Sequence, residues 1–272
     1  MSRLYWNWNK GIYTVLLIIC IIGFWLFENF YLPHGSTREE TIGPEEIIPA
    51  EFLPSSTTGV IVDHAYFSLS YDEPYEQAEW VAYMLNRKQL THDNRKRPYF
   101  VEDPLVKTRS ADWRNYKNSG YDRGHLCPAG DRRFSKQAYD ETFYTSNISP
   151  QNREFNAGVW NRLEQTIRHW ANDNKRLFVV TGGVLEKGLP TIGREQVAVP
   201  EYFYKIVAVG PKGSPKVIAF LLPNEESKLP LRHFVVSVDR VEKMTKINFF
   251  SALPYEVQEI LESKVVLEDW QF

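Results

Sequence analysis

A run of 16 uncharged, mostly apolar residues near the N-terminus, residues 12–27, divides this chain of 272 residues into two parts of different chemistry. With the aromatic residues that come next, the run reaches the roughly 20 residues that a membrane-spanning helix requires. Arg3 and Lys10 precede the run and acidic residues come after it, so the positive-inside bias predicts a cytoplasmic N-terminus. We therefore expect a cytoplasmic flank over residues 1–10 and a transmembrane signal-anchor over residues 11–32.

A cleavable signal peptide is the alternative interpretation of the same run. Bulky residues such as Trp25 and Tyr31 stand where small residues would mark a cleavage site, and this favours a retained anchor. The sequence thus predicts a membrane-anchored protein whose folded part lies outside the cytoplasm, with the bacterial periplasm or the cell exterior favoured. The alternatives are the mitochondrial inner membrane, facing the intermembrane space, and secretion after signal cleavage.

Residues 33–58 have the composition of a linker, because four prolines interrupt them and acidic residues dominate. We expect a single globular domain over residues 59–272, since 43% of the chain is hydrophobic and 14% is aromatic. The two cysteines, Cys20 and Cys127, lie in unlike surroundings and predict no disulfide framework. A net charge of −2 argues neither for nor against a nucleic-acid partner.

Helical and strand-like patterns are mixed in this domain without strict alternation, which predicts an α+β fold with a mostly antiparallel central sheet and flanking helices. The predicted helices are placed by apolar residues at helical spacing and the predicted strands by β-branched alternation. The helices cover residues 74–90, 137–140, 156–171 and 254–262, and the strands cover residues 60–62, 66–70, 143–145, 177–181, 202–209, 216–222, 234–238 and 247–249.

Residues 119–168 concentrate the side chains that phosphodiester hydrolysis needs, which are a base, a cation and groups that hold phosphate. His125 follows Gly124 in a polar segment, and a histidine can take a proton from water near neutral pH. A lone histidine is more often structural, but Arg123 would point to the same side of an extended strand. Its guanidinium can bind phosphate in bidentate fashion, although a surface salt bridge with Asp122 is the alternative.

Asn156, Glu164 and Arg168 lie on the long predicted helix. An amide oxygen can bind Mg²⁺, which needs few protein ligands, yet on spacing alone a helix N-cap is the favoured interpretation of Asn156. Glu164 and Arg168 are one turn apart and fit an ordinary ion pair. The same glutamate lies two turns beyond Asn156, where it can hold the water of a bound metal.

Three motifs in order resemble those of the DNA/RNA non-specific endonuclease family, which includes endonuclease G and secreted bacterial nucleases. They are DRGH at residues 122–125, SNISPQ at residues 146–151, and N-x-x-x-W-x-x-L-E from Asn156 to Glu164. The resemblance extends over roughly residues 60–264. It implies a ββα-metal, or His-Me finger, active site.

The resemblance implies that His125 is the general base that activates water. It implies that Asn156 is the single direct protein ligand of a Mg²⁺ ion, with Mn²⁺ as a substitute. Cleavage of DNA or RNA, with little sequence preference, would then leave 5′-phosphate and 3′-hydroxyl ends.

The resemblance also implies supporting roles for five other residues. Arg123 would stabilise the charged transition state, Glu164 would orient the water shell of the metal, and Arg168 would add positive charge near the phosphate. Asn147 would support His125 or the water around the metal. Asp122 would hold the geometry of the motif, whereas Cys127 is a small buried residue with no role in the chemistry.

Residues 87–136 contain 13 Lys or Arg and six Asp or Glu, a net charge of +7 beside the motif. Such a stretch can follow a nucleic-acid backbone without reading bases. The sequence thus predicts DNA and RNA as partners. It leaves open a homodimer and an inhibitor protein. A nucleic-acid-binding protein without catalysis and a structural interaction protein are the competing classes.

Overall fold

The computed structural model describes residues 3–26, 48–210 and 215–272, with side chains of the first range described over residues 11–22. The chain divides into two compact units, Met1–Glu45 and Glu46–Phe272. The first unit contains the helix α1 (Arg3–Leu26), whose described apolar side chains are exposed. Within the described residues, no helix meets the length and hydropathy that crossing a membrane requires. The transmembrane segment expected over residues 11–32 is therefore not confirmed.

The second unit is built around a seven-stranded sheet in the order β1-β2-β3-β6-β9-β10-β11. Every neighbouring pair in it is antiparallel, which confirms the predicted mostly antiparallel α+β fold. The strands are β1 (Ile61–Asp63), β2 (Ser68–Asp72), β3 (Gln77–Asn86), β6 (Arg176–Gly183), β9 (Tyr202–Val209), β10 (Lys216–Pro223) and β11 (Val235–Val236).

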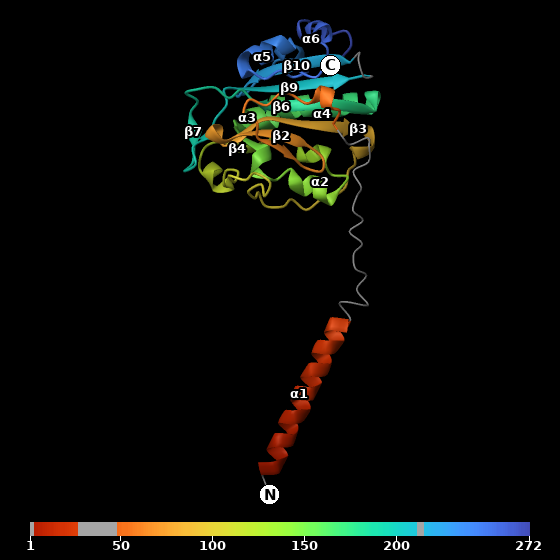
Figure 1. Cartoon of the computed structure of the whole chain (residues 1–272), viewed down its shortest axis with the longest axis vertical. Helices are drawn as coiled ribbons and strands as arrows, with labels where there is room; N and C mark the ends of the chain where they lie inside the picture. The colour runs from red at the N-terminus through yellow and green to blue at the C-terminus, as the bar shows by residue number, and fades with distance from the viewer. Residues whose placement is uncertain (1–2, 27–47, 211–214) are drawn as a thin grey trace. The chain divides into compact units, whose positions relative to one another are not determined.

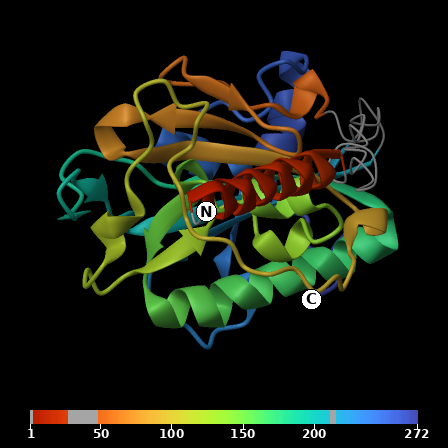
Figure 2. The ribbon, with the colours of Figure 1, turned by 90° about the horizontal axis from the view of Figure 1, so that it is seen from below.

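Helices cover both faces of this sheet. Figures 1 and 2 show α4 (Asn161–Asn174) along one face, where it contacts β3 and β6. On the other face, α5 (Val238–Thr245) and α6 (Tyr255–Glu262) contact β10. Successive side chains of β9 point to opposite faces of the sheet and so belong to two different cores. Phe203 packs in the core beneath α4, and Tyr204 packs in the core beneath α5 and α6.

The strands β4 (Asp122–His125) and β5 (Ile148–Gln151), with the helix that follows β5, form a small unit on the α4 side of the sheet, which we call the finger. β4 pairs antiparallel with β5, and α2 (Lys136–Glu141) lies between them in the chain. After β5 come α3 (Arg153–Phe155), a π-helical turn, η8 (Asn156–Trp160), and then α4. The helix predicted over 156–171 is confirmed, as is the apolar face that it buries. The remaining strands, β7 (Thr191–Ile192) and β8 (Val197–Ala198), pair with each other.

The helix predicted over residues 74–90 is wrong, because β3 occupies most of that range. Ala78, Val81, Ala82 and Leu85 do fall at helical spacing, but the residues between them are buried as well. A central strand covered on both faces reads as a continuous apolar run, so its periodicity cannot separate it from a buried helix.

Three smaller predictions also differ from the structure. In place of the strand predicted over residues 143–145, the structure has a turn, an isolated bridge from Tyr144 to Val101 and the start of a 3-10 helix. Residues 247–249 form no strand. The strand predicted over 234–238 shrinks to the two residues of β11, and α5 begins at its last position, Val238. Most of the linker predicted over 33–58 lies outside the described residues, but its last part joins the second unit. There the Phe52 ring stacks on the Phe178 ring at 5.1 Å between centroids.

Candidate active site

The strand β4 carries Arg123 and His125 to the same side of the finger. The guanidinium carbon of Arg123 lies 5.0 Å from the centroid of the Phe100 ring. The ring centroid of His125 lies 5.7 Å from the same point. Side chains two residues apart on a strand share a face, so the structure brings these two residues together as their spacing predicts.

His125 sits in apolar surroundings. Besides Phe100, the Phe143 ring meets it edge-on at 5.0 Å between centroids. The Nε2 atom of His125 is buried and has no hydrogen-bond partner among the residues that the structure describes. Burial, followed by the positive charge of Arg97, lowers the pKa of His125 from 6.5 to about 3. The imidazole is therefore neutral at physiological pH, which is the form that accepts a proton.

Asn156 does not cap the helix, contrary to the interpretation that its spacing favours. Asn152 is the N-cap, since its side-chain oxygen accepts hydrogen bonds from two backbone N–H groups of the first turn. Asn156 lies one turn further on, at the start of η8. Its Nδ2 donates to Oδ2 of Asp122 at 3.1 Å. This bond joins the helix to β4 and leaves Oδ1 of Asn156 available as a ligand.

Glu164 and Arg168 form the ion pair that their spacing predicts, and a third group joins them. Arg168 donates to Glu164 at 3.3 Å and to Oδ1 of Asp131 at 2.5 Å. Asp131 also accepts a hydrogen bond from the Tyr83 hydroxyl at 3.2 Å. Within the described part of the chain, no hydrogen bond or ion pair connects this group with His125.

A buried lysine lies beside this charged group. Lys205 is fully buried in β9, and its ammonium nitrogen lies 4.6 Å from the centroid of the Trp160 ring. Burial lowers the pKa of Lys205, while the charge of Glu164 opposes that shift. Burial raises the pKa of Glu164, against the charges of Lys205 and Arg168. The glutamate is thus held by Arg168, while Lys205 acts on it through its charge and has no hydrogen-bond partner among the described residues.

Asn147 supports the backbone next to His125 rather than contacting the imidazole. Its side chain is fully buried. Oδ1 accepts a hydrogen bond from the backbone N–H of Cys127 at 2.8 Å, and Nδ2 donates to the carbonyls of Cys127 and Thr142. These bonds fix the chain where it leaves β4, and the buried Cys127 is part of that fixed segment.

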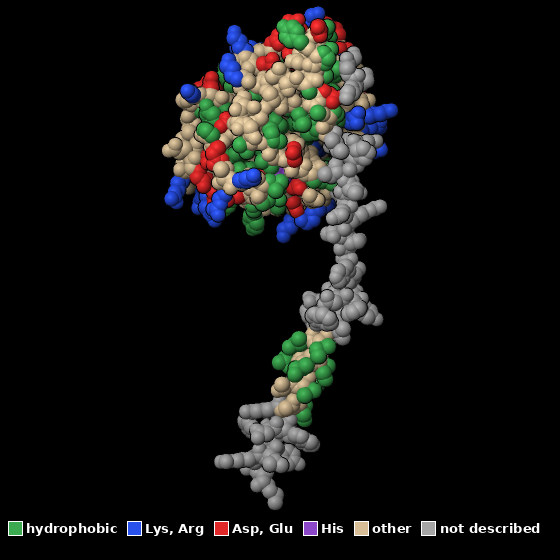
Figure 3. All heavy atoms as spheres, in the orientation of Figure 1, with side chains coloured by type: hydrophobic (Ala, Val, Ile, Leu, Met, Phe, Trp, Pro, Cys, Tyr) green, Lys and Arg blue, Asp and Glu red, His purple; other side chains and the backbone are tan. Residues whose placement is uncertain are grey.

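The basic stretch over residues 87–136 is largely a surface feature. Figure 3 shows Lys and Arg side chains, among acidic ones, on the lower rim of the domain, the side on which Figure 1 shows α2. One member is an exception, because Arg132 is fully buried and donates to the carbonyls of Asp131, Tyr66 and Met84. Arg132 therefore stabilises the fold. It does not contribute to the positive surface charge that the sequence predicts for this stretch.

The donor set around Asn156 fits a Mg²⁺ ion that keeps most of its water. Asn156 offers one hard amide oxygen, and Asp122 holds the amide in place. The structure groups three metal-binding side chains elsewhere, at Asp239, Glu242 and Glu262, and no such triple occurs around His125 among the described residues. A cation bound at Asn156 would consequently have one protein ligand and an open coordination sphere.

Sequence reasoning missed several residues of this site. Arg97 lies over the Phe100 and Phe143 rings at 5.3 and 5.7 Å, which places its charge beside His125. Asp131 and Lys205 complete the group around Glu164. All three lie outside the three motifs, although Asp131 lies between the first two of them. Only the basic run before Pro98 gave any signal for Arg97.

The fold is that of a solved nuclease structure. The chain superimposes on the structure titled "Crystal structure of the EndoG/EndoGI complex: Mechanism of EndoG inhibition" with a TM-score of 0.66 and 29% sequence identity, covering 71% of this chain and 86% of that one. The family model for DNA/RNA non-specific endonucleases matches residues 48–256. The chain therefore belongs to the DNA/RNA non-specific endonuclease family, and the resemblance in its motifs is confirmed.

The curated relatives that the chain resembles are also named as nucleases. The chain is 37% identical over 238 residues to mitochondrial nuclease EXOG of Xenopus laevis, covering 78% of this chain and 64% of that protein. It is 32% identical to mitochondrial endonuclease G of Bos taurus, covering 74% and 73% respectively. A nuclease of a Nostoc strain is 32% identical, covering 86% and 83%. The chain spans 59–64% of the length of the EXOG relatives from Xenopus laevis and Danio rerio.

Proposed function

We propose that this protein is a Mg²⁺-dependent endonuclease that hydrolyses phosphodiester bonds of DNA and RNA, with little preference for sugar or sequence. The products are 5′-phosphate and 3′-hydroxyl ends. The observation that carries the proposal is the finger itself, in which β4 presents Arg123 and His125 together, and Asp122 of the same strand accepts a hydrogen bond from the side chain of Asn156. A neutral base, a phosphate-binding cation and a hard oxygen ligand on one small scaffold suit attack by water on a charged diester.

His125 is the general base in this proposal. Its Nε2 is buried without a partner among the described residues, so Nδ1 is the nitrogen that we assign to take the proton from water. A pKa of about 3 describes the free protein, where burial and Arg97 disfavour the charged imidazole. A bound phosphodiester brings negative charge that offsets Arg97, which raises the basicity of His125 when substrate is present.

Arg123 and Asn156 hold the substrate phosphate between them. The guanidinium of Arg123 rests on the Phe100 ring and can donate two parallel hydrogen bonds to phosphate oxygens. Asn156 would hold Mg²⁺ through its amide oxygen, and the ion would supply positive charge to the transition state. The hydrogen bond from Asn156 to Asp122 fixes the direction of that amide.

Glu164 and Arg168 act around this centre. We assign Glu164 to accept hydrogen bonds from water around the ion, since Arg168 holds it and the charge of Lys205 favours its ionised form. Arg168 supplies further positive charge near the phosphate, but its shortest contact is with Asp131. We therefore expect part of its effect on activity to come through the position of Glu164. Asn147 has a positioning role through the backbone of Cys127.

Substrate binding without base recognition is expected from the exposed cations beside the finger. Arg97, Lys107, Arg109, Lys117 and Arg133 are all exposed. Charges of this kind contact phosphates, which carry no sequence information, and make binding depend on salt. This agrees with cleavage at many sequences.

The test uses the purified full-length chain with supercoiled plasmid and with RNA, in Mg²⁺, in Mn²⁺ or in EDTA. We expect both substrates to be cut in either metal and neither in EDTA. His125→Ala and Asn156→Ala should each lose activity by orders of magnitude while their circular dichroism spectra stay unchanged. His169→Ala, at an exposed histidine on the outer side of α4, is the matched control and should keep full activity. Binding of DNA without cleavage in any metal would instead establish the non-catalytic binding protein.

Attachment to a membrane is part of the same proposal. It rests on the uncharged run of residues 12–27 and on the exposed apolar side chains of its described part, from Ile12 to Ile22. The named relatives include two mitochondrial proteins, which is the compartment of the alternative considered for this chain. Resistance of the protein to alkaline extraction from membranes tests the attachment, and protease protection tests on which side the nuclease domain lies.

A homodimer and an inhibitor protein belong to the proposal as partners. The solved EndoG structure is a complex with an inhibitor by its title. Light scattering of the purified protein measures the oligomeric state directly, and a mass of 31.8 kDa would exclude the homodimer.

A further inference from the structure

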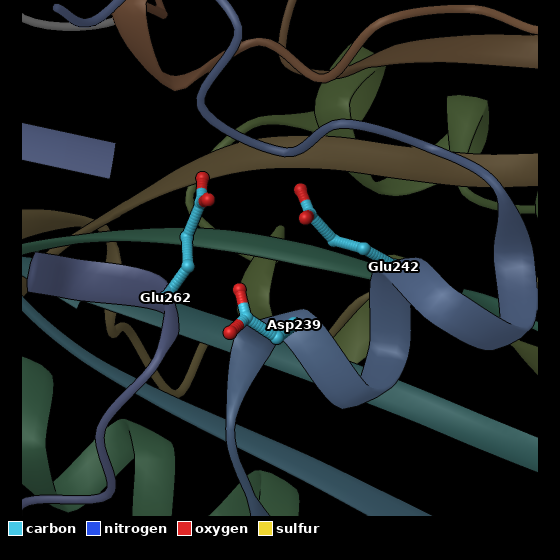
Figure 4. Close-up of side chains that lie close together, drawn as sticks. All are labelled: Asp239, Glu242 and Glu262. Carbon is cyan, nitrogen blue, oxygen red and sulfur yellow. The ribbon is translucent and has the colours of Figure 1, made fainter. Parts of the chain in front are cut away.

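Three carboxylates converge on the face of the sheet opposite the finger. Asp239 and Glu242 lie on successive turns of α5, and Glu262 is the last residue of α6. Figure 4 shows their side chains turned toward a common space between the two helices. One oxygen from each lies within 4.8 Å of the others. They line a surface cavity of about 570 Å³.

One of the three carboxylates is buried without a partner, which sets this group apart from an ordinary acidic surface. Glu262 is only 6% exposed, and its Oε1 has no hydrogen-bond partner among the described residues. Burial, and then the charges of Glu242 and Asp239, raise the pKa of Glu262 to about 7. A buried carboxylate facing two others is costly unless a cation balances it.

The described residues provide few groups that offset the negative charge of these carboxylates. Glu242 accepts one hydrogen bond from the backbone N–H of Phe249 at 2.9 Å. Lys264 lines the same cavity, but no ion pair among the described residues joins a lysine or arginine to the three carboxylates. The cavity therefore gathers three carboxyl groups without a paired cation among the described residues, and it has room for an ion with its water.

We propose that Asp239, Glu242 and Glu262 bind a Ca²⁺ ion. Carboxylate oxygens are the ligands that hard divalent cations prefer, and opposite ligands of Ca²⁺ are separated by roughly 4.6–5.2 Å, against roughly 4.2 Å for Mg²⁺. The three oxygens lie within 4.8 Å of one another, which is close enough for them to share one Ca²⁺ ion. The cavity supplies space for the water that completes the coordination.

Such an ion would tie α6 to α5 and stabilise the C-terminal part of the fold. The two helices contact each other and β10. Along the chain they are joined by the loop between Thr245 and Tyr255. A cation shared by both removes the repulsion of three like charges. The site is independent of the proposed nuclease chemistry, because α5 and α6 pack on the face of the sheet that does not carry the finger.

Calorimetric titration of the full-length chain with CaCl₂ tests the proposal. The background is Asn156→Ala, which removes the proposed ligand of the catalytic ion. We expect one Ca²⁺ per chain, bound with a dissociation constant of about 1 mM or tighter. Asp239→Asn, at an exposed position, should weaken binding at least tenfold, and Glu262→Gln should do the same. Ca²⁺ should also raise the melting temperature in the background but in neither variant.

Glu256→Gln is the matched control, because it removes one charge from α6 at an exposed residue outside the cavity. It should bind Ca²⁺ as the background does. If the background takes up no Ca²⁺ at millimolar concentration, or if Asp239→Asn binds Ca²⁺ with unchanged affinity, the proposal is overturned. Because Asp239→Asn changes an exposed side chain, a folding defect in Glu262→Gln does not obscure the result.

Discussion

Gly124 lies between Arg123 and His125, and replacing it with alanine should distort the finger. A Cβ atom at this position would come within 2.1 Å of the Gln151 side chain, whereas ordinary van der Waals contact begins at 3.4 Å. Gln151 is fully buried on the partner strand β5, so it has little space into which to move. Overpacking of this kind costs about 1–3 kcal/mol of unfolding free energy.

The cost should be visible in both stability and activity. For a domain of this size, about 1–3 kcal/mol lowers the melting temperature by roughly 2–10 °C. A displacement of β4 by about 1 Å also moves His125 and Arg123 away from the substrate, which can reduce kcat/KM by about 100-fold. Differential scanning calorimetry and plasmid cleavage, each with the full-length Gly124→Ala variant, measure the two effects.

Two further variants separate the collision from other effects of the substitution. Gln151→Ala in the Gly124→Ala background removes the colliding atoms and sacrifices no hydrogen bond among the described residues, so it should restore much of the lost stability. Gly158→Ala is the control, because no atom lies within 4 Å of its added Cβ. It should be neutral or stabilising by about 0.5 kcal/mol. An unchanged melting temperature for Gly124→Ala, or no recovery in the double variant, would refute the reasoning.

The remaining predictions concern the groups around the same site. Arg168→Met leaves the buried carboxylate of Asp131 without its cation, so chemical denaturation should show a loss of about 3 kcal/mol; a loss below about 1 kcal/mol would contradict this. His125 has a folded-state pKa near 3, below its unfolded value of about 6.5, so its contribution to stability is present above pH 6.5 and is lost as the pH falls toward 3. Melting curves of His125→Phe should consequently show a weaker loss of stability over that range than the wild type. Asn147→Ala leaves backbone groups of Cys127 unpaired and should destabilise by about 2–3 kcal/mol, while the remaining activity keeps the pH profile of the wild type.

The candidate site could be located from the sequence because its motifs are local. Arg123 and His125 are two residues apart, and an extended strand is enough to place them on one side. The role of Asn156 was harder, because an N-cap and a metal ligand share the same residue type and position. The structure excludes the cap, because Asn152 takes it and Asn156 donates a hydrogen bond to Asp122 instead, and the metal-binding role is our proposal.

Long-range packing hid other residues of the site. Arg97 lies over two aromatic rings that also contact His125, and the charge of Lys205 acts on Glu164 from another element. The two residues of each pair are far apart in the chain. The sequence around Lys205 also does not indicate that this lysine is buried. Arg132 is the opposite case, since a basic run predicts a surface residue and tertiary packing buries it.

Three local motifs in order were enough to carry the resemblance to the family, and mixed helical and strand patterns were enough to predict the mostly antiparallel α+β class. Packing in three dimensions was needed to show that residues 77–86 form a strand, since burial on both faces removes the periodic signal that separates strand from helix. Packing also brought Glu262 to Asp239 and Glu242. Their meeting depends on how two helices pack on one sheet, and such packing joins residues whose separation in the chain carries no signal.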